Sequence, residues 1–229
     1  MIKISVIVPC HDSVDNIANT FAQFESRKYI YETEIIFVEN GSKDSTLKLL
    51  KLFKSNKFEV IILESEKGLG NALRAGISKS TGDVISFIPD DISFHFQELD
   101  EIEKGFNSES LYFLSKYIYP WRYSRSATRM AMGLSFMIIR KIVLRINTRD
   151  TQGTFFGSSM VVKKLFAISA EKEFLITTEI ATLANRLGIE VIEIPVKVLE
   201  GNREKSTVKF RDIIKMTTGL FRLRKIRFN

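Results

Sequence analysis

Short apolar runs alternate with amphipathic segments along the first half of the chain. Three segments with helical spacing, residues 14–27, 42–55 and 70–80, separate four runs rich in β-branched residues. Because these runs are almost continuously apolar, they predict strands buried on both faces, over residues 3–9, 34–40, 59–65 and 83–89. The alternation predicts an α/β fold: a mostly parallel wound sheet flanked by helices, with right-handed crossovers.

The pattern changes in the second half. An aromatic and basic loop, YIYPWRYSR, precedes a helix-like segment over residues 126–146, whose uncharged centre lies between Arg129 and Arg140. A Gly-rich, strand-like stretch follows at residues 153–162. A helix is predicted at about residues 178–187, and a strand at residues 189–198.

Polar residues follow three of the first four predicted strands. HDS follows the first, ENGS the second and PDD the fourth, and in a parallel sheet these carboxyl ends form the usual ligand edge. Asp90 and Asp91 repel each other at the end of a buried strand, so a cation between them is expected. The alternative is that Asp91 caps the helix predicted by the residues after it. Ser42 or Asp44 is expected to cap the helix after ENGS.

The net charge of +7 is concentrated near the C-terminus. The segment from Arg203 to Arg227 contains nine Lys and Arg but only two acidic residues, so the rest of the chain carries no net charge. Such a segment indicates a polyanion or an anionic membrane surface as partner, or else a solvated helix face. A nucleic-acid partner is not expected, because the balanced remainder and the acidic edge argue against it.

Composition limits the compartment. Cys10 is the single cysteine, which excludes an intramolecular disulfide. This is typical of a reducing compartment, the alternative being an exported bacterial protein without disulfides. The first residues read as a strand and not as a secretory signal, and no uncharged apolar run approaches the ~20 residues that span a bilayer. A soluble or peripheral protein is therefore expected.

Four motifs carry a family resemblance. VIVPCHDS, VENGSKDST, KGLGNALRAG and GDVISFIPDD resemble, in this order, the motifs of family 2 glycosyltransferases of the GT-A fold. SKY, DTQ and the final strand followed by NREKST resemble the polyprenyl-phosphate hexosyltransferases of the dolichol-phosphate mannose synthase type. The resemblance implies a GT-A domain over residues 1–210, followed by a basic amphipathic C-terminal helix or tail over residues 211–229.

The resemblance implies a nucleotide-sugar donor and a divalent cation, Mg²⁺ or Mn²⁺. Carboxylates would hold the ion, which neutralises the departing diphosphate. Asp91 stands where the family keeps its metal-binding acid and is the first candidate catalytic residue. Asp90 is the second candidate ligand, and Pro89 stands where the family has another acid. An extended segment would direct the side chains of Asp90 and Asp91 to opposite faces.

The donor nucleotide and sugar are expected to contact the loops at the same edge. Alternatives remain open: ENGS as an ordinary strand-to-helix turn, His11 as a surface residue, and Arg74 as a helix surface charge. The candidate donor-binding residues are Pro9, His11, Glu39, Asn40, Gly41, Lys67, Gly68, Arg74 and Asp90.

The second half is expected to bind the acceptor. A polyprenyl phosphate is already anionic, so it needs cations to position it more than a strong base. By resemblance Asp150 is the second candidate catalytic residue, which orients the acceptor or a phosphate-binding cation or else removes a proton. The candidate acceptor or phosphate contacts are Lys116, Arg122, Gln152, Arg203 and Lys205; the alternative for the cations is a solvated charge.

The resemblance thus predicts an inverting, metal-dependent enzyme that transfers a hexose from a donor of the GDP-mannose or UDP-glucose type to a polyprenyl or dolichyl phosphate at a membrane surface. The protein is expected to be cytoplasmic and peripheral on the cytoplasmic face of the membrane. Residues 126–146 and 213–228 are expected to lie in the interface as amphipathic helices, or else to pack on the domain. A membrane-anchoring subunit is a further expected partner. The alternatives are a glycosyltransferase that extends a surface glycan such as capsule or lipopolysaccharide, a nucleic-acid-binding protein, and a non-catalytic scaffold.

Overall fold

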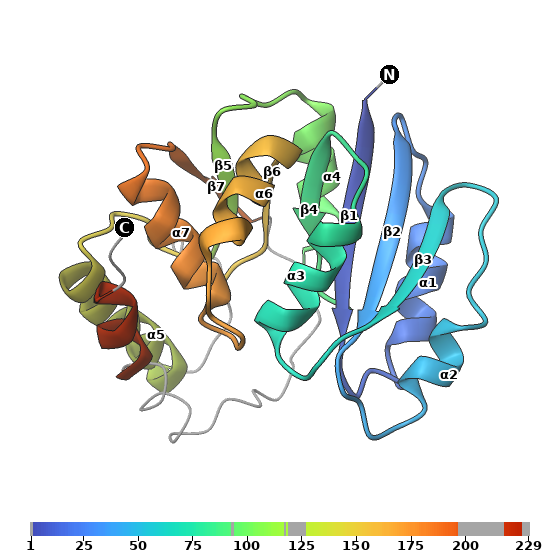
Figure 1. Cartoon of the computed structure of the whole chain (residues 1–229), viewed down its shortest axis with the longest axis horizontal. Coiled ribbons are helices and arrows are strands. Elements are labelled where there is room, and N and C mark those ends of the chain that lie inside the picture. The colour runs from blue at the N-terminus through green and yellow to red at the C-terminus, as the bar shows by residue number, and fades with distance from the viewer. Residues whose placement is uncertain (1, 93, 117, 119–126, 197–217, 226–229) are drawn as a thin grey trace.

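The computed structural model describes residues 2–92, 94–116, 118, 127–196 and 218–225, with residues 127–132 described by their backbone alone. A seven-stranded sheet has the order β3-β2-β1-β4-β6-β5-β7 (Figure 1). The strands are β1 (Lys3–Cys10), β2 (Glu32–Glu39), β3 (Glu59–Glu64), β4 (Val84–Phe87), β5 (Leu111–Ser115), β6 (Phe155–Ser158) and β7 (Val191–Pro195).

The strand directions confirm the predicted α/β class. β1 pairs in parallel with β2 and β4, and β2 with β3, as the alternating pattern predicts. β6 runs antiparallel between β4 and β5, and β5 is parallel to β7. β6 is thus the one reversed strand among those described, within a mostly parallel sheet.

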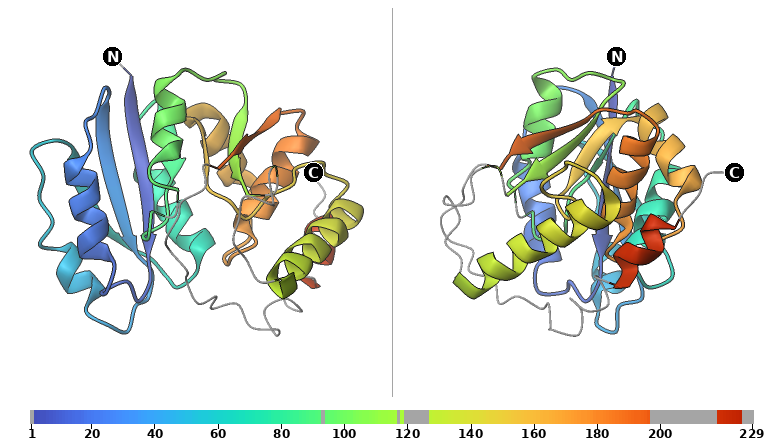
Figure 2. Two further views of the ribbon diagram at one scale, coloured as in Figure 1. Left: turned by 180° about the vertical axis from the view of Figure 1, so that it is seen from behind. Right: turned by 90° about the vertical axis from the view of Figure 1, so that its left-hand side faces the viewer.

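Helices cover both faces of the sheet (Figures 1 and 2). One apolar core includes Phe24, Leu50 and Leu99 from α1, α2 and α4; the other includes Leu73, Val162 and Ile180 from α3, α6 and α7. These helices are α1 (Ile17–Ser26), α2 (Thr46–Leu50), α3 (Leu69–Lys79), α4 (Gln97–Glu103), α6 (Ser159–Ile168) and α7 (Ile176–Arg186).

A third, smaller core lies away from the sheet. α5 (Ala127–Leu144) places Val143 and Leu144 against Leu220 and Leu223 of a helix over residues 218–224. Figure 2 shows the two helices side by side. The inner faces of both candidate membrane helices therefore pack on each other and on Leu175 at the start of α7, while contact of their outer faces with a membrane stays a prediction. The boundary between residues 210 and 211 stays a prediction, because residues 197–217 lie outside the described part of the chain.

Several expected elements differ from the observed ones. β3 is only half-buried, because it lies at the sheet edge, so the prediction of burial on both faces is wrong there. α2 is shorter than its pattern. Ser45 occupies its N-cap position, while the Asp44 carboxylate accepts the N–H of Thr46 at 2.9 Å.

α5 confirms the helix expected over residues 126–146 but not its arrangement of charges. Arg140, expected as a basic flank at the interface, is 1% exposed. Its guanidinium donates hydrogen bonds to backbone carbonyls inside the protein, which makes burial of the charge possible. Within the described residues, no helix has the length and apolar character needed to cross a bilayer.

Candidate active site

The loops after β1, β2 and β4 meet at one edge of the sheet, as predicted. The backbone N–H of Asn40 donates to the Cys10 carbonyl at 3.0 Å, and that of Lys43 to the Asp12 carboxylate at 2.7 Å. Ser13 joins the third loop, because its hydroxyl donates to Oδ2 of Asp90. HDS, ENGS and PDD thus form one continuous polar edge.

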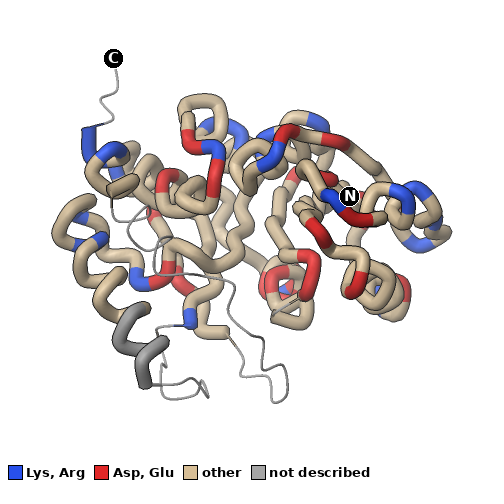
Figure 3. Tube along the Cα trace, turned by 90° about the horizontal axis from the view of Figure 1, so that it is seen from below, with Lys and Arg blue, Asp and Glu red and all other residues tan. Residues whose placement is uncertain are grey.

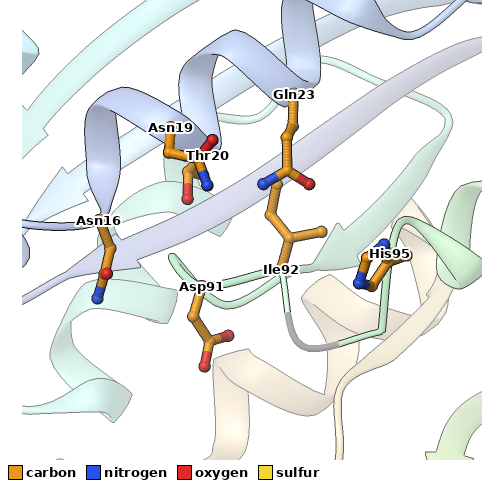
Figure 4. A pocket seen from close by; sticks show the side chains of 7 residues that line it. All are labelled: Asn16, Asn19, Thr20, Gln23, Asp91, Ile92 and His95. Atoms are coloured by element: carbon orange, nitrogen blue, oxygen red, sulfur yellow. The ribbon is translucent and has the colours of Figure 1, made fainter. Parts of the chain in front are cut away.

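Asp90 and Asp91 occupy a turn after β4 and contact different neighbours. Asp90 accepts from the Ser13 hydroxyl through its carboxylate and from the Thr20 hydroxyl through its backbone carbonyl. Asp91 lines a hollow of about 110 Å³ beside α1 (Figure 4). The alternative in which Asp91 caps a helix is wrong, because α4 begins at Gln97 with Phe96 at its N-cap position.

The hollow at Asp91 is lined mainly by polar side chains. Amides and a hydroxyl from α1 face the segment that carries Asp91 and Ile92, and His95 completes the lining (Figure 4). Amide, hydroxyl, imidazole and carboxylate groups can all exchange hydrogen bonds with sugar hydroxyls or with water. The amide and hydroxyl residues are Asn19, Thr20 and Gln23 of α1, together with Asn16 at its N-cap position.

The polar edge is electrostatically negative around the end of β1. Burial raises the pKa of the Cys10 thiol well above its usual range, and the charges of Asp90 and Glu39 raise it further. Among the described residues, no three His, Cys, Asp or Glu side chains are placed to hold one ion. The carboxylates of Asp90 and Asp91 nevertheless suit a hard divalent cation that takes its other ligands from phosphate and water.

The predicted nucleotide loops pack closely together. Glu39 and Asn40 are 7% and 6% exposed; Glu39 accepts the N–H of Ser42, and Asn40 accepts that of Gly68 at 3.4 Å. Gly41 has a φ of 76°, and a Cβ there would lie 3.1 Å from Cβ of Lys67. A side chain at residue 41 would therefore strain the turn and crowd Lys67.

Pro9 and His11 stand at the carboxyl end of β1. Pro9 is buried opposite Val38 of β2, and His11 follows the strand with its Nε2 3.5 Å from the Asp12 carboxylate. Their contact with a nucleotide stays a prediction.

Arg74 contacts the protein rather than standing as a free surface charge. Its guanidinium donates to the Gly70 carbonyl at 3.3 Å and to the carbonyls of Ser169 and Glu171, each at 3.2 Å. These bonds join α3 to the segment between α6 and α7. A nucleotide contact for Arg74 stays a prediction, and the structure adds a packing role.

The acceptor candidates of the described region gather after β5. The carboxylate of Asp150, 1% exposed, accepts the N–H of Lys116 at 3.1 Å and that of Gln152 at 3.1 Å. Lys116 Nζ lies 5.5 Å from the centroid of the Phe94 ring, which is three residues beyond Asp91. The contact brings Lys116 next to the segment that carries Asp91. Gln152 is exposed, and Arg122, Arg203 and Lys205 lie outside the described residues.

Two buried charged residues near Asp150 were not predicted as part of the site. Glu98 accepts a hydrogen bond from Thr154, and burial raises its pKa to about 7. Arg140 binds the loop that carries Asp150. The sequence signal for Arg140 was a pair of cations, Arg140 and Lys141, beside an apolar helix centre. Such a pattern does not distinguish a buried arginine from an interfacial one.

Comparison with known proteins identifies the family. The model of "Glycosyl transferase family 2" matches residues 5–166, more than half of the chain. The chain belongs to this family. Family 2 glycosyltransferases with the GT-A fold were the resemblance expected from the motifs, and the match confirms it.

Curated relatives agree with the expected branch. The human dolichyl-phosphate beta-glucosyltransferase is 30% identical over 116 residues, which are 46% of this chain and 36% of that protein. Dolichyl-phosphate beta-glucosyltransferase ALG5A of Trichomonas vaginalis is 23% identical over 239 aligned residues, covering 97% and 73% of the two chains. The alignment with the human relative thus spans about a third of that protein's length.

Solved structures confirm the GT-A fold. Glucosyl-3-phosphoglycerate synthase of Mycobacterium tuberculosis, in complex with Mn²⁺, UDP-glucose and phosphoglyceric acid, superposes with a TM-score of 0.67 at 14% identity. The superposition covers 97% of this chain and 79% of that one. Another structure of the same enzyme contains Mg²⁺ and UDP.

Proposed function

We propose that this family 2 glycosyltransferase transfers a hexose, with inversion, from a nucleotide sugar to a polyprenyl or dolichyl phosphate at a membrane surface. The observation that carries the proposal is the position of Lys116, whose N–H is held by Asp150 and whose ammonium group lies over Phe94. A cation for an anionic acceptor therefore lies next to the turn that carries the candidate donor ligand Asp91. The dolichyl-phosphate glucosyltransferases among the relatives support this choice of acceptor.

The donor would bind over the loops after β1, β2 and β4. Asp90 and Asp91 would hold Mg²⁺ or Mn²⁺, which when bound neutralises charge on the diphosphate leaving group. Asn40 and Glu39 accept hydrogen bonds from the N–H groups of Gly68 and Ser42, which would help to hold these loops in position for the nucleotide. Pro9, His11, Gly41, Lys67 and Arg74 remain proposed neighbours of the nucleotide.

The acceptor phosphate would bind on the Lys116 side. One of its oxygens would attack the anomeric carbon as the bond from that carbon to the diphosphate breaks, which inverts the configuration. Because the attacking oxygen is already anionic, Asp150 acts here by orienting the backbone at Lys116 and Gln152 rather than by removing a proton. Lys116 favours the reaction by holding the phosphate in line.

A membrane surface fits the outer face of α5. Ile138, Ile139 and Ile142 are 53%, 36% and 69% exposed, while Val143 and Leu144 on the inner face are buried. Lys and Arg residues of α5 and of the helix over residues 218–224 lie at the same end of the molecule (Figure 3). Apolar side chains among cations suit the surface of an anionic bilayer. Peripheral attachment at the cytoplasmic face belongs to this proposal; the comparisons give no support for a separate anchoring subunit.

Label transfer tests the proposal directly. Purified protein would be incubated with radiolabelled UDP-glucose or GDP-mannose, polyprenyl phosphate, detergent and Mn²⁺ or Mg²⁺, and the organic-extractable lipid counted. We expect label in the lipid for one donor, and its loss with chelator or in Asp91→Asn. The matched control is Asp15→Asn, an exposed aspartate near the start of α1, which should transfer normally.

Two further measurements, label transfer to a glycan acceptor and direct binding of nucleotide and cation, separate the alternatives. If the protein binds the donor and labels a polymeric glycan but not the lipid, the acceptor is a glycan and not a lipid phosphate. A folded protein that binds neither nucleotide nor cation would overturn the enzymatic proposal and favour a non-catalytic scaffold.

A further inference from the structure

The loop over residues 148–152 is held from the side of α5 by one buried arginine. Arg140 donates from Nη2 to the carbonyls of Thr148 and Arg149, each at 2.7 Å, and from Nη1 to the Thr151 hydroxyl at 2.9 Å. A planar guanidinium can reach several acceptors at once in a fixed geometry, which an ammonium group cannot reproduce.

A carboxylate holds other groups of the same loop. Glu193 of β7 accepts the N–H of Arg149 at 2.8 Å and that of Asp150 at 2.9 Å. Two carbonyls of this short loop are therefore bound by a cation, and two of its amides by an anion. Such bonds to charged partners are stronger than neutral ones, so both peptide orientations are well determined.

These contacts fix the two side chains at the centre of the loop. Thr151 turns toward α7, where its hydroxyl lies 2.8 Å from that of Thr178. Asp150 turns toward β5, where its carboxylate accepts the N–H of Lys116. A Cβ at Gly153 would lie 2.1 Å from the Leu114 carbonyl, so the end of the loop packs directly on β5.

We propose that Arg140 is a positioning residue for transfer: it holds the 148–152 loop so that Asp150 keeps Lys116 in place for the acceptor phosphate. This inference rests on the proposed function. In this role Arg140 acts on the loop and not on a reacting group, through the carbonyls of Thr148 and Arg149 and the hydroxyl of Thr151. It also links the loop to α5, whose opposite face exposes Ile138 and Ile142.

The test compares Arg140→Lys with Arg149→Lys. The two variants make the same chemical change, but the Arg149 side chain is exposed and its carbonyl remains available to Arg140. In Arg140→Lys we expect kcat for label transfer to fall about tenfold to a hundredfold, the range found for residues that orient the ligands of catalytic metal ions. The KM for the nucleotide sugar should be unchanged, and Arg149→Lys should behave as wild type.

Amide hydrogen exchange gives a second readout that needs no substrate. In Arg140→Lys the N–H groups of Lys116 and Gln152 should exchange faster, while those of β1 and β2 stay protected. Thr151→Val keeps the side-chain shape and removes one acceptor of Arg140. It should also speed the exchange of the Lys116 and Gln152 N–H groups, but by less. It serves as the second variant if Arg140→Lys does not fold.

The outcomes separate this proposal from the proposed function. Unchanged exchange at Lys116 and Gln152 in both variants would overturn the positioning role, and so would faster exchange with unchanged kcat. Absence of transfer in the wild-type protein for every donor would instead overturn the proposed function, and the exchange data would still decide whether Arg140 fixes the loop.

Discussion

The buried carboxylate of Glu34 organises the edge of the sheet opposite the candidate active site. It is 0% exposed and accepts hydrogen bonds from the Ser5 hydroxyl at 2.6 Å and from the backbone N–H of Thr81 at 2.7 Å. Lys3 Nζ lies 3.0 Å from it. Burial alone would raise the pKa of Glu34, but these bonds outweigh burial and lower it to about 2.

Removing the Glu34 carboxylate should destabilise the protein. We expect Glu34→Ala to lower the free energy of unfolding by about 3 kcal/mol, because the buried Ser5 hydroxyl, the two donors of Thr81 and the Lys3 ammonium group lose their acceptor. The control is Glu32→Ala, whose side chain is 63% exposed and also lies near Lys3. Urea unfolding at pH 7 measures both, and equal losses in the two variants would contradict a special role for Glu34.

The lowered pKa of Glu34 also predicts a pH dependence. Since the folded pKa lies below the unfolded value of 4.5, the stabilisation is complete above pH 4.5 and is lost as the pH falls toward 2. Glu34→Gln should show a flatter loss of stability in that window than the wild-type protein. Equal slopes between pH 4.5 and 2 would argue against the lowered pKa.

Glu98 predicts a pH dependence of the opposite sign. Burial raises its pKa from 4.5 to about 7, although a hydrogen bond from Thr154 opposes the shift. The folded protein binds this proton more tightly than the unfolded chain, so stability falls as the pH rises from 4.5 through 7. Glu98→Gln should remove this loss, which is worth up to about 3 kcal/mol. Its free energy of unfolding, relative to that of the wild type, should therefore increase between pH 5 and pH 8.

Unfolding of Glu98→Gln measured at both pH values checks this expectation. Glu66→Gln, at an exposed position, is the control and should follow the wild type. A difference between Glu98→Gln and the wild type that is the same at pH 5 and pH 8 would contradict the raised pKa.

At the scale of elements, α5 carries the prediction for the membrane. The double variant Ile138→Glu, Ile142→Glu would place negative charge on the exposed apolar face of α5 without disturbing the buried Val143 and Leu144. We expect the double variant to lower partition onto anionic vesicles at least about tenfold, because two apolar side chains no longer bury in lipid. Co-sedimentation measures this, and Leu52→Glu, at a position 73% exposed, is the control. Unchanged binding of the α5 variant would assign the contact to another surface.

The elements show how far sequence patterns reach. β1, β2 and β4 were predictable, because continuous apolar runs end there in polar turns, and the rule for parallel sheets then brought HDS, ENGS and PDD together. β5 was not predicted as a strand: Leu111–Ser115 is short, and its partners β6 and β7 lie far away in the sequence. The burial of Arg140 likewise depends on carbonyls that only the folded loop supplies.

At the scale of the molecule, the segment beside the proposed nucleotide site packs against the second half of the chain. The N–H of Gly70 donates to the Lys172 carbonyl at 2.8 Å, and a Cβ at Gly70 would lie 2.3 Å from the Glu171 carbonyl. The Glu171 carboxylate in turn binds Arg222 of the helix over residues 218–224. The proposed nucleotide loop is therefore packed against residues that the family match, which ends at residue 166, does not include.

Ligand linkage tests this arrangement in the whole molecule. A nucleoside diphosphate and Mn²⁺ that bind together only to the folded protein, at about 100 times Kd, would add about 2.7 kcal/mol and raise Tm by roughly 5 to 10 °C. We expect little shift from either ligand alone, because Asp90 and Asp91 supply only part of the ion's coordination. Differential scanning calorimetry should show the joint shift in the wild type and in Asp15→Asn but not in Asp91→Asn. If Asp91→Asn retains the joint shift, residues other than Asp91 hold the cation, since a bound ion stabilises the fold only through the groups that coordinate it.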